Sequence, residues 1–360
     1  MASHKRKETL KMNDNIVTLS STKNKGPAQY DHYIAVDWSQ KNMAIARSNQ
    51  KSKQVHTVDV PSELGDLKDY LSNLKGSKII TIEECPAAQW LYVELTDYVD
   101  KILICDPYRN RLLFDGAKND VLDAEKLCLL LKNGLLKEVY HTHSSLFELR
   151  KYVGAYEDII KAGVRIKNQR SSLFRSEGKN FRKESVESDV NSFIVGIIDK
   201  NIKTYEKDKE QYKSLFEKLK RKDTTLKNLC KIPGIEIISA VKILSNVIDA
   251  HRFPKKGNYL AYCGLVKHKR VSGQKIYGLR NPRYNRVLKS VYKSAALASI
   301  TANNNPMKDY YEYLLDKGVE VHNARNALAR HIATITYGML KSGEKYQPYK
   351  WKKEIELTIN

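Results

Sequence analysis

The stretch Tyr33-Ile-Ala-Val-Asp37-Trp-Ser-Gln-Lys-Asn-Met43-Ala-Ile-Ala-Arg47 decides the fold of the first part of the chain. Its two apolar runs predict neighbouring strands, and the polar residues between them predict a tight turn. Residues 55–60 alternate in strand fashion, and compact apolar runs predict two further strands at 78–82 and 102–105. We therefore expect a β-sheet to form the centre of this region.

Leucine spacing predicts three helices in the same region, at 62–74, 87–99 and 119–131. In the third helix, we expect Leu122, Leu127 and Leu130 or Leu131 to face inward. Three strands followed by alternating helices and strands are typical of a mixed sheet covered by helices. The predicted fold of residues 29–140 is therefore an α/β domain.

Residues 144–225 are predicted to be helical. Apolar side chains recur at helix spacing within 149–160 and again within 198–219, and charged residues fill the other faces. This pattern predicts two long amphipathic helices that form an antiparallel coiled coil, and it favours a packing or dimerisation role for them. The basic, polar stretch 165–183 is expected to be a mobile connection between the two helices.

The remaining regions are a third domain and two tails. Residues 226–345 predict a mostly α domain of short helices and loops, closed by a long helix at 324–340. Residues 1–28 predict a flexible basic tail, and residues 346–360 predict a C-terminal tail. The N-terminus is polar and lacks the apolar core of a secretory signal, so we expect a cytoplasmic, nucleoid-associated protein of a prokaryote.

The composition is that of a globular chain. Of 360 residues, 41% are hydrophobic, and no run approaches the roughly 18 consecutive apolar residues of a membrane span. Five cysteines lie scattered without a C-x-x-C pair, which argues against a zinc ribbon or a disulfide framework. The formal net charge of +22 indicates a polyanionic partner, most often nucleic acid.

The basic charge is concentrated in residues 250–308, which contain no Asp or Glu. A merely solvated surface would carry both signs, whereas a stretch without acids suits a surface that contacts phosphates. Seven cations of this stretch are the candidate nucleic-acid contacts: Lys267, Lys269, Arg270, Lys275, Arg280, Arg283 and Arg286.

Four acidic residues form a candidate metal site. Asp37 and Glu83 end predicted strands, and Asp120 and Asp123 share one face at the start of a predicted helix. Strand ends and a helix start can meet at one edge of a sheet, where clustered carboxylates repel unless a cation joins them. Mg²⁺ is the ion that these carboxylates are expected to bind, because it is hard and prefers oxygen ligands, and Mn²⁺ is the alternative. Such ions support phosphoryl transfer.

Each acid also has a simpler interpretation. Asp120 can cap its helix, and Asp37 can be a turn residue before Trp38. Glu84 competes with Glu83, which we prefer because Glu84 points to the opposite side if the strand continues through it.

A candidate nucleophile is Ser272, in the predicted loop Lys267-His-Lys-Arg-Val-Ser-Gly-Gln-Lys275. A Ser-Gly pair is usually a turn. Here the neighbouring cations Lys269, Arg270 and Lys275 can hold a scissile phosphate, and a serine attack conserves the broken phosphodiester as a covalent link. His268 suits a surface position better than that of a proton shuttle. Upstream, Lys231-Ile-Pro-Gly-Ile235 precedes a helical run and is a weaker candidate for a phosphate contact.

Three of the segments above resemble the RuvC-like (RNase H-like) DEDD nuclease domain of insertion sequence 110 family transposases. They are Tyr33-Ile-Ala-Val-Asp37, Thr81-Ile-Glu83 and Lys118-Asn-Asp-Val-Leu-Asp-Ala124. The family's usual Lys-Thr-Asp-x-x-Asp-Ala has Asn119 here in place of threonine. Glu84-Cys85-Pro86 replaces the usual Ala-Thr-Gly.

The C-terminal half is similar to the serine-bearing second domain of that family. The matching segments are Tyr262-Cys-Gly-Leu265, Ser272-Gly-Gln-Lys275 with Gly278, Arg283-Tyr284-Asn285, Asn305-Pro306, 310–315 and Asn326-Ala-Leu-Ala-Arg330. Gln274 departs from the family's Ser-Gly-Gly-Lys. The resemblance spans about residues 33–340 and implies that Ser272 is the nucleophile.

The resemblance also implies partners. These are donor and target DNA, a structured guide called a bridge RNA, and a dimer of dimers in which the acidic site of one subunit is completed by the serine of another. Two alternatives remain from the residues themselves: a RuvC-like metal-dependent nuclease or junction resolvase without a serine nucleophile, and a non-catalytic nucleic-acid-binding protein.

Overall fold

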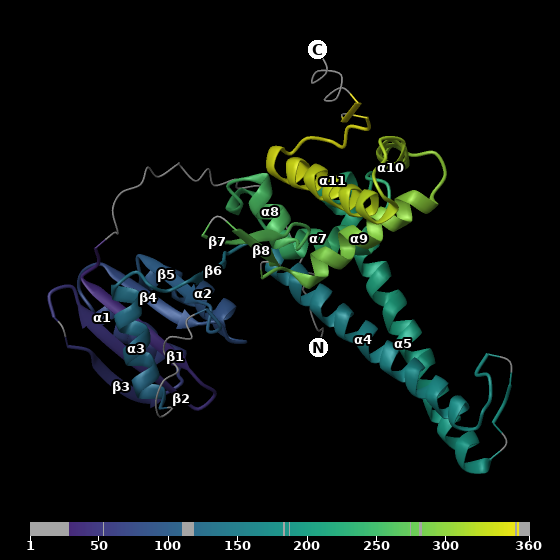
Figure 1. Cartoon of the computed structure of the whole chain (residues 1–360). Helices are drawn as coiled ribbons and strands as arrows, with labels where there is room; N and C mark the ends of the chain where they lie inside the picture. The colour runs from purple at the N-terminus through teal and green to yellow at the C-terminus, as the bar shows by residue number, and fades with distance from the viewer. Residues whose placement is uncertain are drawn as a thin grey trace, which may run out of the picture. The chain divides into compact units, whose positions relative to one another are not determined.

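The computed structural model describes residues 29–52, 54–109, 119–182, 184–186, 188–273, 275–280, 283–349 and 351–352. The predicted tail 1–28 lies outside the described residues, as do Lys118 and Gln274 of the two motifs. The chain divides into two compact units between His143 and Ser144 (Figure 1).

The first unit is built on a six-stranded mixed sheet in the order β3-β2-β1-β4-β5-β6. Strand β1 pairs in parallel with β4, and β4 with β5, while the other pairs are antiparallel. The strands are β1 His32–Trp38, β2 Asn42–Asn49, β3 His56–Pro61, β4 Lys78–Glu83, β5 Lys101–Cys105 and β6 Glu138–Val139. The five predicted strands are confirmed, whereas the two-residue β6 was not predicted.

Helices cover both faces of this sheet. Helices α1 (Leu64–Asn73) and α2 (Ala88–Leu95, continued by the 3₁₀ turn η1, Thr96–Tyr98) bury their leucines against Ile34, Val36 and Ile80. Helix α3 (Asp120–Lys132) packs on the opposite face against Tyr33 and Ala35. The predicted sheet covered by helices is therefore confirmed.

The inward face of α3 differs from the prediction at one position. Leu122 is 41% exposed, whereas Ala124, Leu127, Cys128 and Leu131 are buried. Small Ala124 and Cys128 complete the stripe with Leu127 and Leu131, which lets the helix lie close to the alanine-rich centre of β1 and β2. The prediction counted leucines only, so it included the exposed Leu122 and missed the small buried residues Ala124 and Cys128.

Two long antiparallel helices begin the second unit, α4 (Leu146–Ser176) and α5 (Asp189–Lys222) (Figure 1). The prediction of a mobile connection from residue 165 was wrong, because α4 continues to Ser176. Arg170 pairs with Asp199 of α5 at 2.6 Å and lies over the ring of buried Phe174. Polar residues here stay helical because they pair across the two helices.

The rest of the second unit is a helical bundle that carries one β-hairpin. Its core joins Leu149, Val153 and Phe216 from the long helices to Tyr259 and Tyr292 of the bundle. The elements are α6 Thr224–Leu229, α7 Ile237–Val247, η3 Ala250–Arg252, α8 Lys256–Tyr262, β7 His268–Ser272, β8 Lys275–Arg280, α9 Arg286–Thr301, α10 Pro306–Asp316 and α11 Val321–Ser342. Within the described ranges, no helix has both the length and the apolar character needed to cross a bilayer.

Candidate functional site

Two of the four candidate acids lie side by side at one edge of the sheet. The parallel pairing of β1 and β4 ends with Val36 opposite Ile82, so Asp37 and Glu83 each follow that pair by one residue. Strand alternation places both on the face that α3 covers, because Tyr33, Ala35 and Ile79 of the same alternation contact that helix. The sequence pattern placed these residues correctly at strand ends.

The other two acids lie in the first turn of α3. The N-cap is Asn119, whose side chain accepts a hydrogen bond from the Val121 amide at 3.1 Å, so Asp120 is not the cap. Asp120 and Asp123 instead lie where the helix dipole favours negative charge. Lys126 lies 3.8 Å from Asp123 and supplies a partial counter-charge.

The four carboxylates interact electrostatically. Burial raises the pKa of Asp37, and the charges of Asp120 and Asp123 raise it further. Burial likewise raises the pKa of Glu83, with additional contributions from Asp37 and Asp123. The charges of Asp120 and Asp123 thus disfavour ionisation of Asp37, and those of Asp37 and Asp123 disfavour ionisation of Glu83, which identifies one shared region of negative potential.

This region suits a hard divalent cation in charge and in donor type, since all four side chains offer carboxylate oxygens. Among the described residues, however, no three acidic, histidine or cysteine side chains are already gathered closely enough to hold a metal ion. Ligation by these four residues would require their side chains to draw together.

Glu84 has a different partner. Its carboxylate lies 2.7 Å from Nε2 of His141, whose Nδ1 lies 2.7 Å from Oε1 of Gln89. Burial of the His141 side chain, 4% exposed, fixes this pairing away from the other acids. Sequence reasoning missed His141, because a single histidine after a short strand has no distinctive spacing.

Ser272 lies at the tip of an exposed β-hairpin. The prediction of a loop for 267–275 was wrong: Ser272 is the last residue of β7 and pairs with Lys275, the first residue of β8. Gly273, with a φ of +52°, begins the turn between them, a conformation that favours glycine. The strand pattern was missed because most hairpin residues are exposed, so no buried face produces a clear alternation.

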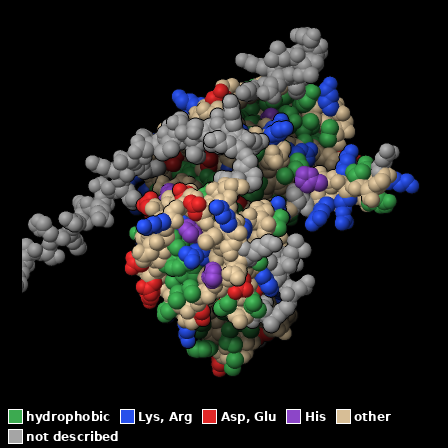
Figure 2. Space-filling model, turned by 90° about the vertical axis from the view of Figure 1, so that its left-hand side faces the viewer, with side chains coloured by type: hydrophobic (Ala, Val, Ile, Leu, Met, Phe, Trp, Pro, Cys, Tyr) green, Lys and Arg blue, Asp and Glu red, His purple; other side chains and the backbone are tan. Residues whose placement is uncertain are grey.

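The hairpin and the residues that flank it expose cations and one aromatic ring to solvent. All seven candidate contacts, Lys267 to Arg286, are exposed. The register shifts between Arg270 and Val271, so that Tyr277 is the extra residue of a bulge and is 70% exposed. Figure 2 shows an arm on which Lys and Arg side chains gather with no visible Asp or Glu. Such a surface can contact phosphates and stack on bases.

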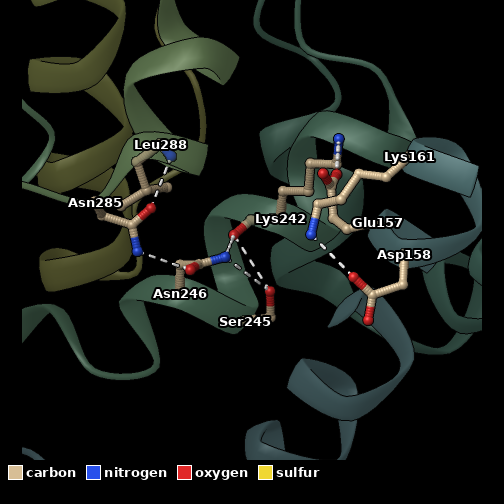
Figure 3. A network of polar contacts seen from close by, with 8 residues as sticks. All are labelled: Glu157, Asp158, Lys161, Lys242, Ser245, Asn246, Asn285 and Leu288. Carbon is tan, nitrogen blue, oxygen red and sulfur yellow. Dashed lines mark hydrogen bonds and ion pairs between the residues drawn. The ribbon is translucent and has the colours of Figure 1, made fainter. Parts of the chain in front are cut away.

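Polar contacts fix the two ends of the hairpin to the bundle. The Asn285 amide donates to the carbonyl of Tyr262 at 2.7 Å, which joins the segments before and after the hairpin. Asn285 also caps α9 through the Leu288 amide at 3.0 Å and donates to Asn246 of α7 at 2.8 Å (Figure 3). The hairpin is thus an exposed arm on a rigid base.

The same network continues into the long helices. Lys242 of α7 forms an ion pair with Glu157 of α4, beside the exposed Asp158–Lys161 pair (Figure 3). Tyr262 packs against Phe253, and its hydroxyl donates to the carbonyl of Asn246. It therefore belongs to the base of the hairpin.

Comparison with known proteins concerns this same part of the chain. Residues 226–312 match the transposase IS116/IS110/IS902 family. The matched region contains the whole hairpin, Ser272, Asn285 and α9. It does not reach the four acids of the first unit.

A similar protein is the insertion element IS110 uncharacterized 43.6 kDa protein of Streptomyces coelicolor. The two are 30% identical over 120 residues, which is 33% of this chain and 29% of the relative. The match thus spans less than a third of that relative's length. Both comparisons connect the chain to insertion-sequence proteins.

Proposed function

We propose that this protein is a DNA transposase and recombinase that excises and inserts a mobile element by phosphoryl transfer. The observation that carries the proposal is the position of Ser272, exposed at the tip of an acid-free basic hairpin inside the region that matches a transposase family. In this proposal, the six-stranded α/β unit is the RuvC-like (RNase H-like) nuclease domain.

The chemistry assigned to Ser272 is a transesterification. Its Oγ attacks a DNA phosphorus and forms a serine phosphodiester, while the broken P–O bond leaves a DNA hydroxyl that takes up the serine proton. Attack by a DNA hydroxyl on the serine ester reverses the exchange and joins strands without an external energy source. Lys269, Arg270 and Lys275 hold the phosphate oxygens and stabilise their charge in the transition state.

Asp37, Glu83, Asp120 and Asp123 are the residues that would hold Mg²⁺ or Mn²⁺. A divalent cation bound there would neutralise the phosphate charge during strand exchange. The support for this assignment is the raised pKa of Asp37 and of Glu83, which burial and the neighbouring acids cause and which a cation would relieve.

The partners in this proposal are donor and target DNA, a bridge RNA, and further copies of the chain. Assembly as a dimer of dimers would bring the acids of one subunit to Ser272 of another. An exposed apolar stripe on α5 supports self-association through the long helices. Val190 is 68% and Phe193 is 72% exposed there, an unusual state for large apolar side chains on a helix.

A strand-transfer assay tests the proposal with DNA that carries the ends of the element and with the RNA that co-purifies. Wild type should recombine, whereas Ser272→Ala and Asp123→Ala should not. A metal nuclease without a serine nucleophile would keep its activity in Ser272→Ala. A non-catalytic binding protein would give no strand transfer even as wild type, and neither substitution nor removal of Mg²⁺ would change its binding to DNA.

A further inference from the structure

A cavity of about 520 Å³ lies in the second unit, between α8, α10, α11 and the residues Glu344, Lys345, Gln347 and Trp351. Three aromatic rings line it. The rings of Tyr310 and His331 stack with centroids 4.2 Å apart, and Trp351 meets Tyr310 edge-on at 5.2 Å. The cavity is distinct from the hairpin, and its volume falls in the range of small-molecule sites.

Two polar atoms of these rings lack partners. Nε2 of His331 and Nε1 of Trp351 are buried and make no hydrogen bond within the described part of the chain. Both atoms are closed to water as the side chains stand, so a ligand would reach them only if the rings turn toward the cavity. A ligand with both a donor and an acceptor would then remove the cost of leaving these buried polar groups unpaired. Burial, aided by the charge of Lys256, lowers the pKa of His331 to about 4, so the ring is neutral at pH 7 and can serve in either role.

The charged residues of the cavity are mainly cationic. Lys256, Arg330 and Lys345 line it together with one acid, Glu344. Aromatic rings, unpaired ring nitrogens and an excess of cations are the features that recognise a base and its phosphate. A hydrocarbon ligand would use neither the nitrogens nor the cations.

We propose that this cavity binds one unpaired nucleotide, with its base among Tyr310, His331 and Trp351 and its phosphate at Lys256, Arg330 and Lys345. This inference rests on the proposed function, because the nucleotide would belong to the DNA or RNA that the protein handles. The site would hold a single base out of its stack while the hairpin contacts the backbone elsewhere.

Calorimetric titration of the full chain tests the site with ribonucleoside and deoxyribonucleoside 5′-monophosphates, and with deoxyribose 5-phosphate as the probe that lacks a base. Saturable binding of at least one mononucleotide should be roughly tenfold tighter than that of the sugar phosphate, since stacking strengthens binding by about that factor or more. Preference for one series identifies RNA or DNA as the source. Equal affinity for the sugar phosphate, or no saturable binding, would overturn the proposal.

Matched substitutions locate the binding. Lys256→Gln and His331→Phe should each weaken mononucleotide binding, His331→Phe while keeping a ring against Tyr310. The control Lys255→Gln changes the neighbouring exposed lysine, which does not line the cavity. Equal affinity of the Lys256 and Lys255 variants would overturn the assignment. Because no DNA is cut in this titration, its result is independent of whether Ser272→Ala abolishes recombination.

Discussion

Asp37, the penultimate residue of β1, and Glu83, the last residue of β4, lie on adjacent parallel strands in the same register, one residue beyond the Val36–Ile82 pair. Both are half-buried on the α3 side, and the charge of Asp37 contributes to the raised pKa of Glu83. This arrangement destabilises the ionised form of the folded protein and prepares a position for positive charge. Its consequences can be measured separately from catalysis.

Removing one of these charges should stabilise the metal-free protein. We expect Asp37→Asn to raise the melting temperature at pH 7 without divalent ions by a few degrees, because it removes a half-buried charge repelled by Asp120 and Asp123. Asp66→Asn, an exposed acid in the first turn of α1, is the control and should not raise it. The account fails here if Asp37→Asn is less stable than wild type in EDTA.

The pH dependence of stability follows from the same pKa shifts. A carboxyl whose pKa is raised on folding binds its proton more tightly in the folded state, so stability falls as pH rises from the ordinary values of 3.8 and 4.5 through the raised ones. The proposed Mg²⁺ site requires the ionised forms, so Mg²⁺ should raise the melting temperature at pH 7.5 and not at pH 4. Thermal unfolding followed at both pH values, with Ca²⁺-free Mg²⁺ and with EDTA, measures the difference. Equal stabilisation by Mg²⁺ at the two pH values would argue against binding at these acids.

The sequence predicted the first unit well because its pattern is set by burial. Strand β1 alternates between two buried faces, and the acids stand at strand ends that parallel pairing must bring together. The prediction failed where burial is not the cause of structure. The residues after Arg165 stay helical through ion pairs with α5, and the exposed hairpin β7–β8 is held by backbone pairing and by contacts at its base.

The base of the hairpin should contribute measurably to stability. Asn285→Ala removes the cap of α9 and the bond to Asn246, so we expect the free energy of unfolding to fall by about 1–2 kcal/mol. Urea denaturation measures this change. Asn323→Ala is the matched control, because the Asn323 side-chain amide donates to exposed Glu320. If both variants unfold at the same urea concentration, the proposed anchoring of the hairpin is wrong.

The cations of the hairpin should contact phosphates and not bases. Arg280→Gln is expected to weaken binding to DNA of any sequence and to reduce the slope of log K against log salt by roughly 1. Lys101→Gln, an exposed lysine at the start of β5, should leave the slope unchanged. Anisotropy titrations over a salt series give both slopes. A loss confined to one DNA sequence would show that Arg280 reads a base instead.

The candidate acids could be placed from sequence because their pattern is local to strand ends and a helix start. His141 could not, since its pairing with Glu84 depends on the tertiary position of the segment after β6. The cavity could not be predicted from sequence either, because its lining residues come from separate parts of the chain: α8, α10, α11 and the segment that contains Glu344 and Trp351.

The most direct test of the central claim is isolation of a protein–DNA adduct from a reaction stopped in denaturant, followed by mass spectrometry of the linked peptide. Wild type should carry a DNA phosphate esterified to Ser272, and Ser272→Ala should form no adduct. An adduct mapped to another residue, or DNA cleaved and rejoined with no protein attached at any time, would contradict it.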